Sequence, residues 1–169
     1  QVKITKPKIG IMVEVPSVLL QIAEFSELVD FFSVGSNDLT QYLLAVDRNN
    51  PHVANVYSHF HPAVLRALQR LVQDCIEHQK PVSICGEMAG DPLTAILLMA
   101  MGFNTLSMSS SNILRVRKAI CHVPMADAKK LLNEVLQMNN PLLIKSWLEH
   151  YFRTHGLGDM VKSNRLVNA

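Results

Sequence analysis

Short apolar runs alternate along the chain with longer stretches in which apolar residues recur every three or four positions. A short apolar run is typical of a buried strand, and the longer spacing is typical of an amphipathic helix. Strands are therefore predicted at residues 8–15, 31–34, 82–85 and 105–108. Helices are predicted between and after them, at residues 18–28, 39–45, 63–78, 92–101 and 112–120. A last pair of helices is predicted within residues 125–152, divided at Asn139-Asn140-Pro141.

The alternation of strands and helices predicts a parallel sheet covered by helices. Nearly continuous apolar strands also predict that both faces of this sheet are buried. Four strand–helix units are half of an eight-stranded barrel, which typically needs roughly 250 residues, whereas this chain has 169. The predicted fold class is therefore α/β, with parallel β/α units forming the carboxyl-terminal half of a (β/α)8 TIM-type barrel. An open four-stranded sheet is the alternative.

The half-barrel is expected to span residues 1–153 and to be followed by a frayed polar tail at residues 154–169. Ser17 is the expected N-cap of the first helix, Pro62 the expected start of the third, and Gly102 the expected stop of the fourth. An open barrel edge exposes unpaired backbone groups. A half-barrel is therefore expected either to form a homodimer or to belong to a longer polypeptide.

Composition narrows the classes of protein further. Hydrophobic residues make up 49% of the chain and charged residues 18%, which argues against disorder. The formal net charge is +2 and the basic residues are dispersed, so no nucleic-acid partner is expected. No apolar run reaches membrane-spanning length, so no membrane partner is expected either. Reduced thiols in a cytoplasmic protein are expected, because no metal-type spacing links Cys75, Cys85 and Cys121.

Two acidic residues lie where predicted strands end. Glu14 interrupts an apolar strand, and a buried carboxylate must be paired or bind a metal; an internal salt bridge to Lys or Arg explains it equally well. Asp38 follows the second strand beside Asn37, where helix capping or an Asx-turn is the commoner use of such residues. Because the carboxyl ends of parallel strands meet at one edge, the two carboxylates are expected to be neighbours. Such a pair suits Mg²⁺.

Cys85 is expected at the carboxyl end of the third strand, followed by Gly86 and Glu87. A thiol at that place is a candidate reactive group, although most free cysteines are small buried hydrophobes. The polar segment 47–61 is long, and long loops in compact domains tend to be functional. Its spacing matches no metal-binding pattern, which favours structural roles for His52, His59 and His61.

Several longer motifs resemble, in the right order, those of the phosphoenolpyruvate-utilising enzyme family. The motifs are GIMVEVP (10–16), DFFSVGSNDLTQY (30–42), AVDR (45–48), HPAV (61–64), CGEMAG (85–90) and SMS (107–109). The resemblance covers roughly residues 9–118. It is closest to the enzyme I branch, which includes a nitrogen-related paralogue, and more distant to pyruvate phosphate dikinase and phosphoenolpyruvate synthase.

The resemblance implies a phosphoenolpyruvate-protein phosphotransferase of the sugar or nitrogen phosphotransferase system, with an eight-stranded β/α barrel as its substrate domain. It implies Mg²⁺ as the cofactor, with Glu14 and Asp38 as ligands. It also implies that phosphoenolpyruvate (PEP) contacts Asn37, Asp38 and Arg48, and that Cys85 protonates the enolate of pyruvate. A thiol suits this task because thiols are mostly protonated near neutral pH.

The resemblance also implies parts that this sequence lacks. The family's phosphoryl-accepting His belongs to a separate amino-terminal domain, and no segment here matches its motif. The arginines of the earlier barrel strands are also absent, so this chain by itself is expected to be inactive. The implied partners are PEP, pyruvate, a His phosphocarrier protein reached through the missing domain, and a second copy in a homodimer. Ser36 stands where Thr is common in the family, which keeps the hydroxyl.

Three alternatives remain open from the sequence. A pyruvate phosphate dikinase or PEP synthase would carry an additional nucleotide-binding domain outside this sequence. A non-catalytic dimerisation or regulatory module has no chemical need for the carboxylate pair and the thiol. A thiol-redox role for Cys85 lacks a Cys-x-x-Cys partner.

Overall fold

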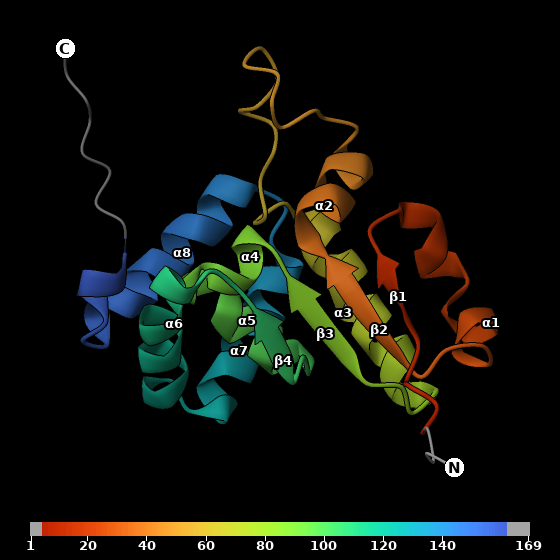
Figure 1. The fold of residues 1–169 in the computed structure, drawn as a ribbon. Helices are drawn as coiled ribbons and strands as arrows, with labels where there is room; N and C mark the ends of the chain where they lie inside the picture. The colour runs from red at the N-terminus through yellow and green to blue at the C-terminus, as the bar shows by residue number, and fades with distance from the viewer. Residues whose placement is uncertain (1–4, 162–169) are drawn as a thin grey trace.

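The computed structural model describes residues 5–161 and contains a four-stranded sheet (Figure 1). Its strands are β1 (Gly10–Val13), β2 (Phe31–Gly35), β3 (Val82–Cys85) and β4 (Thr105–Ser107). They follow one another across the sheet in chain order, and each is parallel to its neighbours. The four strands predicted from the apolar runs are thereby confirmed.

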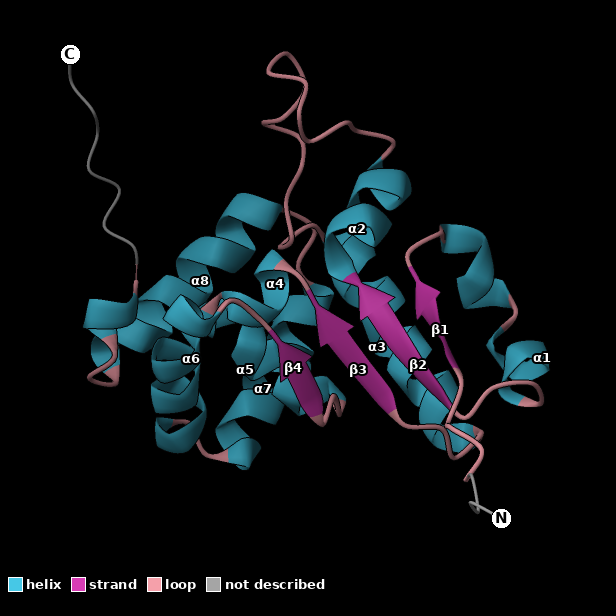
Figure 2. Ribbon diagram, in the orientation of Figure 1, coloured by secondary structure: helices cyan, strands magenta, loops and turns pink. Residues whose placement is uncertain are grey.

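Helices connect the strands and cover one side of the sheet. They are η1 (Pro16–Leu20), α1 (Ile22–Ser26), α2 (Ser36–Leu44), α3 (Pro62–Glu77), α4 (Glu87–Gly90), α5 (Pro92–Met101), α6 (Ser110–His122), α7 (Met125–Gln137), α8 (Pro141–Thr154) and η2 (Gly158–Met160). Figure 2 shows α3, α5 and α7 behind the sheet, and the face toward the viewer carries no helix. Strands in chain order with helices on one face are the arrangement of a barrel, not of a doubly wound sheet. The predicted fold class is confirmed: these parallel β/α units are consistent with the carboxyl-terminal half of a TIM-type barrel.

The core lies between the sheet and the helices behind it. Phe32, Val34 and Ile84 are fully buried and belong to one cluster with the apolar faces of α3 and α5. Successive strand side chains point to opposite faces, and Met12 on the other face is 48% exposed. The expectation that both faces are buried is therefore wrong for the described residues, because their helices cover only one face.

The helix ends follow the sequence signals in most places. His61 caps α3, with its Nδ1 accepting from the Ala63 amide at 3.2 Å, and Pro62 opens the helix as predicted. Gly102 ends α5 in a left-handed conformation. The first helical stretch differs. One helix over residues 18–28 capped by Ser17 is wrong, because η1 and α1 are separated at Gln21 and Ser17 lies inside η1.

The last helices and the start of the predicted tail pack together. The division between α7 and α8 is confirmed, and Asn140 caps α8 by accepting from the Leu142 amide at 2.9 Å. Residues 154–161 are not frayed, because Leu157, Met160 and Val161 are buried. The rest of the predicted tail, residues 162–169, lies outside the described residues. Within residues 5–161, none of the helices has both the length and the apolar character needed to cross a membrane.

The buried face of α5 leads to a prediction about stability. Leu97 on α5 is completely buried, whereas Leu114 on α6 is 75% exposed. We expect Leu97→Ala to lower the free energy of unfolding by about 2–5 kcal/mol, because the shortened side chain leaves a cavity. The matched change Leu114→Ala is expected to stay within about 0.5 kcal/mol. Urea unfolding of both variants measures the difference, and equal losses would contradict the described packing.

Candidate active site

The register of the sheet brings the carboxyl ends of three strands into one row. Gly35 at the end of β2 pairs with Cys85 at the end of β3, and Cys85 pairs in turn with Ser107. Glu14 follows the last residue of β1, and its side chain lies next to Gly35. Its Oε2 lies 2.8 Å from the point that a Cβ on Gly35 would occupy. Glycine at position 35 therefore leaves the space in which the Glu14 carboxylate lies.

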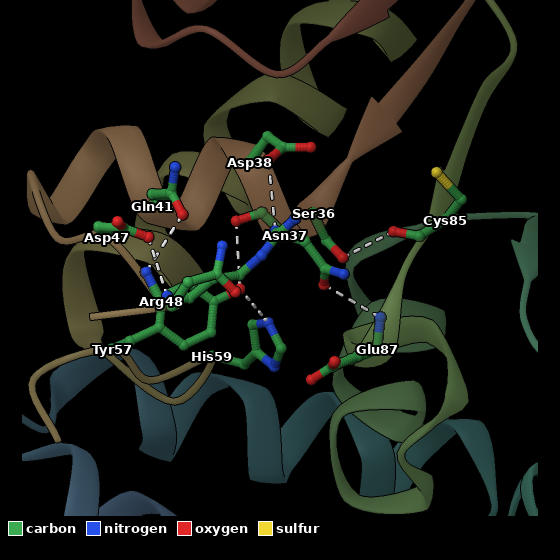
Figure 3. A network of polar contacts seen from close by, with 11 residues as sticks. Ser36, Asn37, Asp38, Gln41, Asp47, Arg48, Tyr57, His59, Cys85 and Glu87 are labelled. Carbon is green, nitrogen blue, oxygen red and sulfur yellow. Dashed lines mark hydrogen bonds and ion pairs between the residues drawn. The ribbon is translucent and has the colours of Figure 1, made fainter. Parts of the chain in front are cut away.

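The first turn of α2 contacts the turn between β3 and α4. Ser36 Oγ donates a hydrogen bond to the Cys85 carbonyl at 2.6 Å, and the Glu87 amide donates to Asn37 Oδ1 at 3.1 Å (Figure 3). Ser36 and Asn37 lie in the first turn of α2. The bond to Oδ1 leaves the NH₂ group of the Asn37 side chain as the end that can donate to a ligand.

Gly86 makes this close approach of the two turns feasible. It has φ +106°, a conformation that side chains of L-residues rarely adopt. A Cβ on Gly86 would lie 2.5 Å from Ser36 Oγ and 2.9 Å from Asn37 Oδ1. A larger residue would therefore strain the backbone and displace the turn that carries Asn37.

Arg48 reaches the same place from the segment after α2. Ala45 ends α2 in the left-handed region with φ +52°, and the Arg48 amide donates to Gln41 Oε1 at 3.2 Å. Arg48 Nη1 lies 3.3 Å from Asp38 Oδ1. This contact is an ion pair by distance, but Nη1 is buried and forms no hydrogen bond of good geometry within the described residues. The guanidinium thus retains donor capacity next to Asn37 and Asp38.

An open pocket of about 350 Å³ lies between the ends of β3 and β4. Its lining includes the thiol-bearing Cys85 and the amide-bearing Asn37, together with Glu87, Ser107 and Asn112. The pocket brings a thiol and a side-chain amide together at the edge where barrel folds place their chemistry.

Four of the predicted site residues lie at or directly after the carboxyl ends of the strands: Glu14, Asn37, Asp38 and Cys85. Arg48 joins them through its contact with Asp38, and of the five only Asn37 and Cys85 line the pocket. Glu14 makes no ion pair with a Lys or Arg of residues 5–161, so the internal salt bridge considered for it is not observed. Asp38 pairs with Arg48 and does not cap α2. The roles of Glu14, Asn37, Asp38, Arg48 and Cys85 remain predictions, since their placement alone does not test them.

Sequence reasoning did not single out Tyr57 and favoured a structural role for His59, although both contact the site. Tyr57 and His59 come from the long segment 47–61, and the Tyr57 hydroxyl donates to the Asn37 carbonyl at 3.1 Å. Neither residue belongs to a periodic pattern, and the length of the segment was the one signal that pointed to it. Glu87, to which the sequence assigned no role, contributes the amide that holds Asn37.

The three cysteines have different surroundings. Cys85 is half-buried at the site, Cys121 is exposed, and Cys75 is buried inside α3. Burial raises the pKa of Cys75 to about 12, so that thiol stays protonated and unreactive. Of the two more accessible thiols, Cys85 is the one that lies at the carboxyl edge of the sheet.

Fold and site together define the class of this protein: a β/α half-barrel with carboxylate, amide, guanidinium and thiol groups at the carboxyl ends of its parallel strands. Comparison with protein families then gives a specific assignment. Residues 1–125 match the family described as PEP-utilising enzyme, PEP-binding domain, and the chain belongs to this family. The resemblance noted in the sequence motifs is thereby confirmed.

Several curated proteins are similar over most of the chain. A protein of Salmonella typhimurium named "Phosphoenolpyruvate-dependent phosphotransferase system" is 40% identical over 94% of the chain. Two proteins named "Phosphoenolpyruvate-protein phosphotransferase" are also similar, one from Cupriavidus necator (40% identical over 79% of the chain) and one from Borreliella burgdorferi (37% over 85%). The chain spans 21%, 23% and 25% of the lengths of these relatives, respectively.

The geometry at Gly86 leads to a second prediction. We expect Gly86→Ala to lower the free energy of unfolding by about 1–3 kcal/mol, because its strained φ is combined with a clash against Ser36 and Asn37. Gly156→Ala is the matched control: Gly156 also has a positive φ, of +75°, but a Cβ there meets nothing within 4 Å. The control should show backbone strain alone, about 1 kcal/mol. Denaturant unfolding measures the free energy of unfolding of both variants. An equal loss of this free energy in the two would rule out the predicted clash.

Proposed function

We propose that this chain is the PEP-binding part of a phosphoenolpyruvate-protein phosphotransferase. The observation that carries the proposal is the placement of Asn37, Arg48 and Cys85 at one edge of the sheet in a chain of the PEP-binding domain family. The names of the similar proteins favour a phosphotransferase over a dikinase or a synthase. The reaction transfers the phosphoryl group of PEP to a His that belongs to another domain.

Asn37 and Arg48 bind the phosphoryl group in this proposal. The free NH₂ end of Asn37 donates one hydrogen bond to it. The guanidinium of Arg48 presents a planar set of donors that fits phosphate oxygens, and its Nη1 has no hydrogen-bond partner within residues 5–161. Both groups position the phosphoryl group, and Arg48 adds positive charge; positioning and charge are the main requirements of phosphoryl transfer.

Glu14 and Asp38 are the proposed magnesium ligands. The described residues offer no cluster of three or more His, Cys, Asp or Glu side chains that could hold a metal ion. Two carboxylates nevertheless fit Mg²⁺, which commonly binds one or two of them and completes its shell with water and substrate phosphate. The lack of a cationic partner within 4 Å of Glu14 in the described part of the chain agrees with this role. Bound Mg²⁺ would offset the negative charge of the phosphate.

Cys85 is the proposed proton donor. When the bond between phosphorus and the bridging oxygen of PEP breaks, the phosphoryl group passes to the acceptor His and the enolate of pyruvate remains. The Sγ–H bond of Cys85 then breaks, and its proton forms a C–H bond at the methylene carbon to give pyruvate. The resulting thiolate regains a proton from solvent. The position of Cys85 in the pocket beside Asn37 supports this role.

The proposal includes three further features of the full-length enzyme. It passes the phosphoryl group to a His phosphocarrier protein, it forms a homodimer, and it is located in the cytoplasm. The exposed apolar side chains of α8, Leu142 and Leu143, are 75% and 63% exposed and agree with a further protein contact.

Calorimetric titration of PEP into the protein tests the binding site. We expect saturable binding that requires Mg²⁺, and Arg48→Gln should weaken it about tenfold or more, because a hydrogen-bonded charge on the phosphate is lost. Arg70→Gln is the matched control, since Arg70 is exposed on α3 and pairs with Asp74. If PEP fails to bind both this chain and the full-length polypeptide that carries it, the proposed function is wrong.

The rate of pyruvate formation tests the role of Cys85. In the full-length polypeptide, we expect Cys85→Ala to slow this rate by about 10²-fold or more, because a general acid typically contributes that much. The affinity for PEP and Mg²⁺ should be unchanged. Cys121→Ala, which alters an exposed thiol, is the control and should leave the rate unchanged. A rate equal to that of the unmodified enzyme would remove Cys85 from the mechanism.

A further inference from the structure

The long segment between α2 and α3 returns to the site through two aromatic residues. The Tyr57 hydroxyl lies 3.1 Å from the Asn37 carbonyl oxygen and 2.9 Å from His59 Nε2. The two rings meet edge to face, with centroids 5.2 Å apart and planes 72° apart. Figure 3 shows His59, Tyr57 and Asn37 joined in this order. Neither Tyr57 nor His59 has a role in the reaction proposed above.

Counting hydrogens fixes the direction of these bonds. A tyrosine hydroxyl has one hydrogen, and a backbone carbonyl oxygen can only accept. The hydrogen of Tyr57 must therefore point to Asn37, which makes the hydroxyl oxygen an acceptor toward His59. Nε2 of His59 must carry a hydrogen and donate it, and in the neutral ring Nδ1 is then bare. The relay runs from His59 to Tyr57 to the backbone of Asn37.

The surroundings keep both members of the relay neutral. Burial lowers the pKa of His59, although the negative charges of Glu87 and Asp91 partly oppose it. Burial also raises the pKa of Tyr57, although the nearby positive charge of Arg48 opposes that shift. A neutral relay adds no net charge beside a site that is proposed to bind an anion.

The relay completes the support of Asn37. The Glu87 amide holds the side-chain oxygen of Asn37 from the turn after β3, and Tyr57 holds its backbone carbonyl from the long segment after α2. Residue 37 is therefore fixed at both ends by segments far from it in sequence. Tyr57 also ties the long segment, which carries Arg48, to the start of α2.

We propose that Tyr57 and His59 are positioning residues that fix Asn37 for contact with the phosphoryl group of PEP. This inference rests on the proposed function. It assigns a task to the long segment beyond carrying Arg48. Since His59 acts through Tyr57, losing either hydrogen bond has the same effect as losing both.

A mutant cycle on the full-length polypeptide tests the relay, with the dissociation constant of PEP in the presence of Mg²⁺ as the readout. We expect Tyr57→Phe to weaken binding about two- to tenfold, the effect of losing one hydrogen bond. Tyr42→Phe is the control, because Tyr42 is 57% exposed. His59→Leu should match Tyr57→Phe, and the double variant should be no weaker than either one alone. His59→Gln should restore binding, because its amide can donate at the position of Nε2.

Each outcome decides the question. Equal affinities of Tyr57→Phe and Tyr42→Phe would overturn the inference, and so would additive losses in the double variant. If the unmodified protein does not bind PEP, the proposed function fails, and nitrogen NMR of His59 then tests the relay by itself. A hydrogen on Nε2 with a bare Nδ1 supports the relay, and the opposite tautomer overturns it. Unfolding free energies of the variants separate a loss of positioning from a loss of folding.

Discussion

The site depends on the register between β2 and β3. Gly35 lies opposite Cys85, so the turns that follow the two strands emerge side by side, and the Ser36 hydroxyl joins them through the Cys85 carbonyl. A shift of one residue would turn every side chain of a strand to the other face. Cys85 would then point into the helical layer, and Asn37 would lose its contact with the Glu87 amide. The relative positions of the site residues therefore depend on how the backbones of β2 and β3 pair.

Small residues make this register compatible with close contact. Gly35 gives room to the Glu14 carboxylate, and Gly86 gives room to Ser36 and Asn37. In both places a methyl group would come closer to a polar side-chain atom than real side chains allow. The polar groups of the site thus occupy space that two glycines leave open.

Much of this arrangement could be predicted from the sequence. Apolar runs locate the strands, and parallel pairing then brings their carboxyl ends together, which is why Glu14, Asp38 and Cys85 could be placed at one edge. The division at Gln21 could not be predicted, because the apolar spacing continues across it without Gly or Pro. The contact of Tyr57 with Asn37 spans 20 residues and follows no period, so it becomes visible only in three dimensions.

The attachment of Cys85 has a consequence for the proposed reaction. Its backbone is held in β3 and by the hydrogen bond from Ser36, so the position of the sulfur depends on a single torsion angle with few staggered values. An enolate is planar and has two faces. In the proposed reaction, a thiol held in this way on one wall of the pocket would deliver its proton to only one of them. PEP that carries deuterium and tritium in defined positions as its two methylene hydrogens would then give, in ordinary water, pyruvate with a methyl group of one handedness.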